Sequence, residues 1–307
     1  MATTQELYIQ SLLAQAAYAN LAIGSISNTS SLIANANMTD AQATDFASKW
    51  KVVNQYTDLS GVGATVFQEI STGKKYLAIR GTEGLADLGA DYILALGYPS
   101  YLNPQFVALR GVIQTWINNG TLGSGFSITG HSLGGYLATA IGTWFGTQTG
   151  GVYTYNAPGV GGISGNTLDA FRTAFGLGNT PLVNNLNNIR GTAGISLISG
   201  LGLQLSPPVM VETEFNLNPV MNHSIVNLTD SLAVQSTISK LDSTLSIATL
   251  NNYVKQAGNV EKSEQENTLD SLQRILGVVA TTPTGDRKKL WENIIARVGR
   301  TRLQCAA

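Results

Sequence analysis

Residues 130–134 read Gly-His-Ser-Leu-Gly, which are the residue types of a serine nucleophile held in a sharp turn. The residues Phe-Ser-Ile-Thr at 126–129 before it predict a short strand, and the small residues from Gly135 onward predict a helix. In such a strand–turn–helix the serine backbone is strained, so its neighbours must lack bulky side chains. The hydroxyl then lies at a helix N-terminus, where the helix dipole favours developing negative charge. The pattern predicts Ser132 as a nucleophile.

A serine hydroxyl is a weak nucleophile and needs a general base. The chain contains two histidines, His131 and His223. His131 adjoins Ser132, and because successive side chains point apart, we expect it to face into the body of the protein as a packed core histidine. By elimination the base is predicted to be His223, which follows an extended segment at 209–215.

The developing oxyanion needs preorganised N–H donors. One candidate is the backbone N–H of Leu133, the residue after the nucleophile. The second is expected in the loop after an early strand, and residues 77–83, Leu-Ala-Ile-Arg-Gly-Thr-Glu, fit that place. There Gly81 permits a turn, and Thr82 can donate through its N–H and its hydroxyl.

Local patterns also predict the elements that must hold these groups. Thr39 opens a capping box, with Phe46 and Trp50 on one face of the helix that follows. A hairpin is expected from strands at 61–70 and 75–79. Further helices are expected at 7–22, 106–118, 136–145 and 168–175, and further strands at 126–129 and 152–155. Strands that alternate with helices indicate an α/β sheet that is partly parallel.

Three segments taken together carry a family resemblance: 80–82, 130–135, and 152–161, which reads Val-Tyr-Thr-Tyr-Asn-Ala-Pro-Gly-Val-Gly. They resemble the class 3 lipases, which are α/β-hydrolases acting on triacylglycerols, and most of all the bacterial members embedded in large secreted proteins with calcium-binding repeats. The stretch 222–232 resembles those members too. The resemblance spans about residues 40–235.

The resemblance implies a mixed, mostly parallel sheet flanked by helices. It implies the same site residues, listed by role: Ser132 as nucleophile, His223 as base, and Thr82 with Leu133 as the oxyanion hole. It also suggests secretion. Because this chain has no repeats of that kind, calcium is not implied, and we expect no cofactor and no metal.

The acid of the expected triad is where the chain departs from the family. The matching stretch, 186–195, contains no carboxylate. Between nucleophile and base the acids are Asp169, expected on a solvent-facing helix, and Glu212 and Glu214, on one side of the extended segment. We take Glu212 as the first candidate. The alternatives are an amide oxygen of Asn187 or Asn188, the carboxylate of Asp230, and a dyad oriented by backbone carbonyls.

Composition excludes several classes of function. Among 307 residues, 18 Lys and Arg face 19 Asp and Glu, for a net charge of −1, which excludes a generic basic surface for nucleic acid. One cysteine excludes an internal disulfide or a cysteine-rich zinc module, and two histidines exclude a histidine-rich metal centre. Charged residues make up only 12%. With the apolar segments 94–101 and 195–209 beside the expected cleft, this suits an acyl chain better than a charged metabolite.

The expected organisation is a catalytic core with N-terminal helices over 1–235 and a helical C-terminal extension over 236–307, packed on the core or acting as a cap. Residues 261–307 are rich in charge and contain two amphipathic stripes. Residues 1–15 do not have a signal-peptide pattern, and no apolar run is long enough to cross a membrane. We therefore expect secretion by a route without an N-terminal signal peptide, and otherwise a cytoplasmic protein.

These observations predict a carboxylic ester hydrolase, specifically a lipase that cleaves triacylglycerols and other uncharged acyl esters through a serine acyl-enzyme. Rival enzymes with the same motif are a phospholipase, a polyester depolymerase and an acyltransferase. A rival of another class is a binding module on a hydrolase fold that has lost catalysis, suggested by the missing carboxylate. A third hypothesis makes the chain one domain of a larger adhesive or toxin-like protein.

Overall fold

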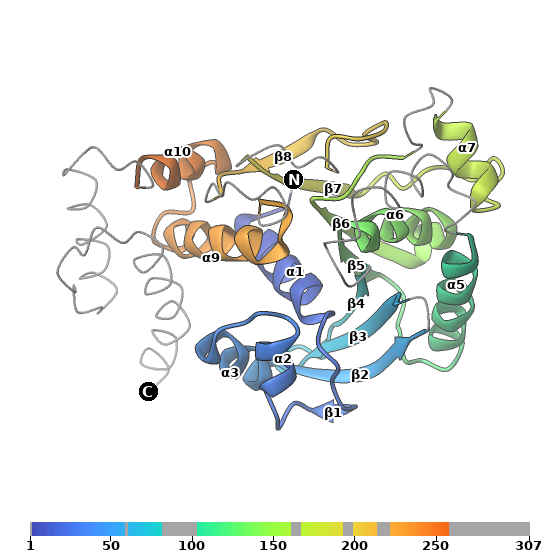
Figure 1. The fold of residues 1–307 in the computed structure, drawn as a ribbon, viewed down its shortest axis with the longest axis horizontal. Coiled ribbons are helices and arrows are strands. Elements are labelled where there is room, and N and C mark those ends of the chain that lie inside the picture. The colour runs from blue at the N-terminus through green and yellow to red at the C-terminus, as the bar shows by residue number, and fades with distance from the viewer. Residues whose placement is uncertain are drawn as a thin grey trace.

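The computed structural model of the chain describes residues 2–58, 61–81, 103–160, 167–192, 199–213 and 222–257. At its centre is an eight-stranded sheet whose strands lie side by side in chain order (Figure 1). The first four strands pair antiparallel, and the fourth to the eighth pair parallel. The strands are β1 (Gly24–Ser25), β2 (Trp50–Thr57), β3 (Gly63–Glu69), β4 (Lys75–Arg80), β5 (Phe126–His131), β6 (Thr149–Tyr155), β7 (Leu186–Gly191) and β8 (Pro208–Val211).

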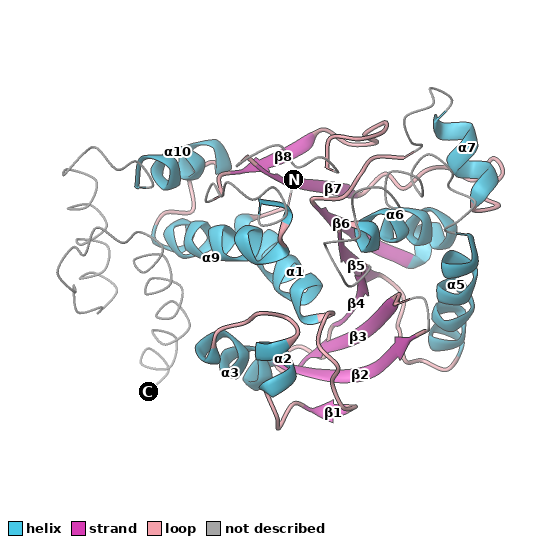
Figure 2. Ribbon diagram, viewed as in Figure 1, coloured by secondary structure: helices cyan, strands magenta, loops and turns pink. Residues whose placement is uncertain are grey.

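Helices cover both faces of this sheet (Figure 2). On one face lie α5, α6 and α7, and on the other lie α1 and α9, with α10 beside α9. The helices are α1 (Thr4–Ala16), α2 (Ser30–Ala34), α3 (Asp40–Lys49), α5 (Asn103–Asn118), α6 (Leu133–Phe145), α7 (Thr167–Ala174), α9 (Ile225–Leu241) and α10 (Ile247–Ala257), with a short 3-10 turn, η2 (Gly146–Gln148). This layering confirms the predicted α/β class.

The core lies on both sides of the parallel strands. Along β6, Val152 packs against α6, whereas Tyr153 and Tyr155 pack against α1 and α9. Alternate residues of a strand point to opposite faces of its sheet, so β6 is buried on both of its faces. The tyrosine hydroxyls are bonded to α1, Tyr155 to the carbonyl of Leu7 at 2.6 Å and Tyr153 to the carboxylate of Glu6 at 2.5 Å. The first helix is therefore built into the centre of the fold.

Most predicted elements near the nucleophile are confirmed, with ends that move by a few residues. The capping box is present: the side chain of Thr39 accepts from the N–H of Gln42, whose own side chain accepts from the N–H of Thr39. The first helix ends at Ala16, earlier than expected. Trp50 was expected on the helix that contains Phe46, but it begins β2 and stacks on Phe46 with ring centroids 6.0 Å apart.

Strand β2 was not expected from the sequence. It mixes polar and apolar residues, and only Trp50 and Val52 of its eight residues are buried. Its extended conformation comes from backbone pairing with β3 over almost its whole length, from Trp50 opposite Glu69 to Thr57 opposite Gly63. A backbone ladder of this kind leaves little trace in side-chain periodicity.

The described part of the C-terminal region is helical. Helix α9 runs through residue 235, where the boundary of the core was expected, so the division at 235 and 236 stays a prediction. Residues 258–307, including the two amphipathic stripes, lie outside the described residues. Within the described residues, no helix has the length and apolar character needed to cross a membrane.

Asn251 of α10 forms hydrogen bonds with backbone groups at the end of the edge strand β8. Its Nδ2 donates to the carbonyl of Met210 at 2.7 Å, and its Oδ1 accepts from the N–H of Glu212 at 2.8 Å and from Nε2 of Gln235 at 2.9 Å. An edge strand presents N–H and C=O groups that must find partners. The side chain of Asn251 therefore forms two of the backbone hydrogen bonds that a neighbouring strand would otherwise form.

Replacing Asn251 with leucine is expected to lower the free energy of unfolding by about 1–3 kcal/mol, because polar groups that it serves lose their partner. Urea denaturation followed by circular dichroism measures the change. The matched control is Asn252→Leu on the exposed side of the same helix, for which a change within about 0.5 kcal/mol is expected. Equal effects at the two positions would refute the assigned role of Asn251.

Candidate active site

Ser132 lies in a sharp turn between β5 and α6. Its backbone has φ 58° and ψ −128°, a left-handed φ that residues other than glycine rarely adopt. The N–H of Ser132 donates to the carbonyl of Tyr155 at 2.9 Å, and its carbonyl accepts from the N–H groups of Gly135 and Tyr136. Strand β6 and the first turn of α6 thus hold the strained residue from two sides.

Glycines around Ser132 bring three backbones into contact. A Cβ on Gly130 would lie 2.4 Å from the carbonyl oxygen of Gly134, and one on Gly135 would lie 2.6 Å from Cβ of Ala157. A Cβ on Gly134 would lie 2.3 Å from the carbonyl oxygen of Ile79 on β4. The expectation that bulky neighbours are excluded from this turn is confirmed.

The structure brings His223 to Ser132. Nε2 of His223 lies 2.9 Å from Oγ of Ser132, and both residues are buried. His223 stands directly before α9, where the side chain of Ser224 caps the helix by accepting from the N–H of Val226. A neutral imidazole at this distance can accept the serine proton, which is the geometry a nucleophile and its base require.

His131 is a buried core histidine, as expected, but it also contacts the candidate base. Its Nδ1 lies 2.9 Å from the hydroxyl of Tyr18, and its Nε2 lies 2.8 Å from the backbone carbonyl oxygen of His223. The two imidazole centroids are 4.9 Å apart. Sequence reasoning identified the burial of His131 and missed both polar contacts.

Asn156 is a site residue that sequence reasoning did not single out. It follows β6 with φ 44°, a left-handed value that asparagine tolerates better than most residues. Its Nδ2 donates to the carbonyl oxygen of His223 at 3.1 Å, and its Oδ1 accepts from the N–H of Gly191 at 3.0 Å. The available signal was an asparagine directly after an apolar strand, where side-chain amides often serve nearby backbone.

Burial decides the charge of both histidines. It lowers the pKa of His131 from the usual 6.5 to about 4, although the bond to the His223 backbone opposes the shift. Burial also lowers the pKa of His223 well below 6.5, and the neighbouring His131 lowers it further. Both imidazoles are therefore neutral at neutral pH, which leaves His223 able to accept a proton.

The lowered pKa of His131 predicts a pH dependence of stability. Between pH 6.5 and about 4 the unfolded chain binds this proton and the folded chain does not, so stability falls as the pH falls. The contribution is fully present above pH 6.5, and we expect about 3 kcal/mol to be lost by pH 4. Urea denaturation at a series of pH values measures it. His131→Gln should show a shallower slope, and an unchanged slope would contradict the prediction.

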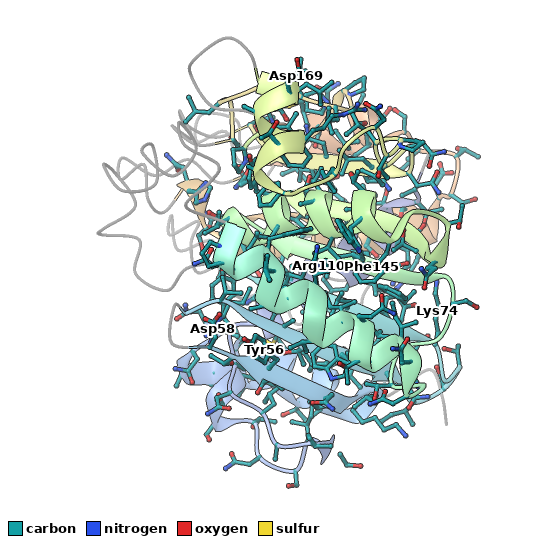
Figure 3. The ribbon with its side chains drawn as sticks, turned by 90° about the vertical axis from the view of Figure 1, so that its right-hand side faces the viewer. Tyr56, Asp58, Lys74, Arg110, Phe145 and Asp169 are labelled. Atoms are coloured by element: carbon teal, nitrogen blue, oxygen red, sulfur yellow. The ribbon has the colours of Figure 1, made fainter. Side chains whose placement is uncertain are left out.

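The candidate acids do not gather at His223 in the described part of the chain. The carboxylate of Glu212 accepts from the hydroxyl of Thr192 at 2.7 Å, and among the described residues it does not bond to His223. Asp169 is exposed on α7, at the top of the view in Figure 3. Asp230 accepts from the side chain of Gln42 at 3.0 Å.

The remaining candidates for the acid are amides, a second glutamate or backbone. Nδ2 of Asn188 donates to the side chain of Gln204 at 2.8 Å, whereas the neighbouring Asn187 is less buried. Glu214 lies outside the described residues. The role of Glu212 as the acid stays a prediction.

The predicted oxyanion donors lie on segments that meet beside Ser132. Leu133 is the first residue of α6, so its N–H points out of the helix without an acceptor in the same helix. The end of β4 packs against this turn, since a Cβ on Gly134 would lie 2.8 Å from the nitrogen of Gly81. Thr82 follows Gly81 but lies outside the described residues. The oxyanion roles of Leu133 and Thr82 stay predictions.

The parallel strands, the strained serine between β5 and α6, and a histidine that follows the last strand define the architecture. This is the α/β-hydrolase fold. No family model matches the chain, and no curated protein sequence matches it either. Among solved structures, the matches include fungal lipases.

Three of these structures illustrate the similarity. Lip2 lipase from Yarrowia lipolytica is 17% identical with a TM-score of 0.38, over 70% of this chain and 81% of that chain. The lipase from Rhizopus microsporus var. chinensis is 16% identical with a TM-score of 0.37, over 68% and 74%. A triacylglycerol lipase from Penicillium expansum is 12% identical with a TM-score of 0.35, over 69% and 82%. The expected resemblance to bacterial, repeat-containing lipases stays a prediction.

Proposed function

We propose that this protein is a carboxylic ester hydrolase that works through a serine acyl-enzyme. The observation that carries the proposal is the 2.9 Å contact between Oγ of Ser132 and Nε2 of His223. It occurs where the backbone of Ser132 is strained and both side chains are buried. Strain at a turn that holds a nucleophile beside a base is typical of a catalytic site.

The proposed reaction has two halves. His223 takes the proton of Ser132 as its Oγ attacks the ester carbonyl, and the N–H of Leu133 together with Thr82 stabilises the oxyanion. His223 then protonates the leaving alcohol, which departs and leaves an acyl-serine. Water attacks this ester with His223 again as base, which releases the carboxylic acid product and the free enzyme.

The proposed substrates are uncharged acyl esters, with triacylglycerols as the leading class. The low charge content supports this choice, and so do two exposed apolar side chains: Met210 near the carboxyl end of β8, and Leu203 in the loop before β8, where it bridges to Val160 after β6. An apolar rim favours an acyl chain. Phospholipids and polyesters are the alternative substrates.

The test follows hydrolysis of p-nitrophenyl butyrate and p-nitrophenyl laurate by purified wild-type protein, and then of a triacylglycerol, a phosphatidylcholine and an aliphatic polyester. Preference for laurate and triacylglycerol supports a lipase, and preference for phosphatidylcholine supports a phospholipase. Folded protein that neither hydrolyses these esters nor reacts with a fluorophosphonate supports the binding module instead.

The Glu212→Gln variant tests the predicted acid in the same assay. Loss of a triad carboxylate lowers kcat by about 10⁴-fold, because the imidazole loses its tautomer and its charge partner. The matched control is Thr192→Val, which removes the hydroxyl bonded to Glu212 and spares the carboxylate. A loss confined to Glu212→Gln assigns the acid, and equal, small changes in both variants reject Glu212.

A further inference from the structure

The backbone carbonyl oxygen of His223 receives two buried donors. Nε2 of His131 lies 2.8 Å from it, and Nδ2 of Asn156 lies 3.1 Å from it. A carbonyl oxygen can only accept, so Nε2 of His131 must carry the proton in this arrangement. Nδ1 of His131 then has the lone pair, and the hydroxyl of Tyr18 donates to it at 2.9 Å. The direction of each hydrogen bond follows from this one acceptor.

These residues come from four separate parts of the fold. Tyr18 lies in the turn after α1, His131 ends β5, Asn156 follows β6, and His223 precedes α9. Helix α1 is itself tied to the same strands, since the hydroxyl of Thr129 on β5 donates to the carbonyl of Gln10 at 2.9 Å. The start of α9 is thereby attached to the end of β5, which leads into the turn of Ser132, and to the residue that follows β6.

We propose that His131 is a positioning residue that, with Tyr18 and Asn156, holds the main chain of His223 so that its ring stays within reach of Ser132. The proposal rests on the proposed function, because it treats His223 as the base. The proposal gives His131 a role in the site, whereas its place beside Ser132 in the sequence indicates only a packed core histidine.

The energetic reason is that a general base works only within a narrow range of positions. A displacement of about 1 Å can lower the rate about 100-fold. Two donors on one carbonyl oxygen restrict the backbone of His223 more than a single bond does. The donors are also neutral, whereas a cation 4.9 Å from the His223 ring would oppose the positive charge that develops on that ring during the reaction. Within the described residues, the titratable side chains that face His131 are the Tyr18 hydroxyl, bonded to its Nδ1, and the His223 ring.

The test compares variants that remove or keep the donor. His131→Leu removes it and should lower kcat about 100-fold with KM changed less than about threefold. His131→Gln, whose amide can place a donor near the position of Nε2, should recover at least about tenfold of that loss. Equal kcat in the two variants would overturn the proposal, as would a KM effect larger than the kcat effect.

A tyrosine pair keeps the test independent of folding. Tyr18→Phe should lower kcat about tenfold, because His131 loses the bond that fixes its tautomer. Tyr153→Phe is the matched control, since it also removes one tyrosine hydroxyl, in this case the one that bonds from β6 to Glu6 of α1, and it should leave kcat unchanged at a similar cost in stability. If both variants lose the same activity, the contact with His131 has no specific role.

Nitrogen NMR of ¹⁵N-histidine-labelled protein separates this inference from the proposed function. With two histidines in the chain, the spectrum of His131→Gln assigns both rings. We expect His131 as the neutral tautomer protonated at Nε2, and a shift of the His223 ring signals in Tyr18→Phe but not in Tyr153→Phe. If wild-type protein hydrolyses no ester, the proposed function fails while these spectra still decide the arrangement. An Nδ1-protonated or cationic His131 at neutral pH would overturn it.

Discussion

Replacing Ser132 with alanine is expected to lower kcat for p-nitrophenyl ester hydrolysis by about 10⁶-fold, because the attacking oxygen is removed. His223→Ala should cost about as much, since the hydroxyl beside it at 2.9 Å then has no base. The two residues act as a unit, so the double variant should be no slower than either single variant. Initial rates with active-site titration of the wild type measure these ratios.

A matched serine and a covalent label complete that experiment. Ser127→Ala changes another buried serine, on the strand β5 that leads into the turn of Ser132, and kcat should stay within about twofold of the wild type. A fluorophosphonate should add its mass to wild type and to Ser127→Ala, and should not react with Ser132→Ala. Residual activity of Ser132→Ala above about one hundredth of the wild type would reject Ser132 as the nucleophile.

Replacing Gly134 with alanine is expected to lower the free energy of unfolding by at least about 3 kcal/mol. The added Cβ would lie 2.3 Å from the carbonyl oxygen of Ile79, 2.8 Å from the nitrogen of Gly81 and 2.9 Å from the carbonyl carbon of Arg80. All three are backbone atoms at the end of β4, which is paired on both sides. They cannot rotate away as a side chain could, so α6 must move away from the sheet.

The same movement should displace the turn that carries Ser132, so kcat of any Gly134→Ala protein that folds should fall about 100-fold. The control is Gly111→Ala on α5, where the added Cβ meets nothing within 4 Å. That substitution should stabilise the protein by up to about 1 kcal/mol, because alanine favours a helix more than glycine does. Urea denaturation of the two variants gives the comparison, and a Gly134→Ala variant as stable as wild type would contradict the argument.

Local signals were sufficient for the elements around Ser132. The turn between β5 and α6 follows from glycines that are close in sequence. The hairpin of β3 and β4 follows from an alternating segment and a short apolar run that are joined by a short turn. The capping box at Thr39 involves residues three positions apart. Each of these features is decided within a few residues, so side-chain pattern predicts it well. Strand β2 was not predicted, because its extended conformation depends on pairing with β3 and not on its own side-chain pattern.

For the site, the sequence by itself determined that one of two histidines must serve any histidine base, and that Ser132 stands in a turn shaped for a nucleophile. Only the tertiary structure decided which groups surround that pair. It places the ring of His131 and the amide of Asn156 on the backbone of His223, and it places the carboxylate of Glu212 on Thr192. These contacts join residues far apart in the chain, and they depend on which strands end side by side. The spacing of residues along one strand carries no information about its neighbours, so these contacts appear only when the sheet is assembled.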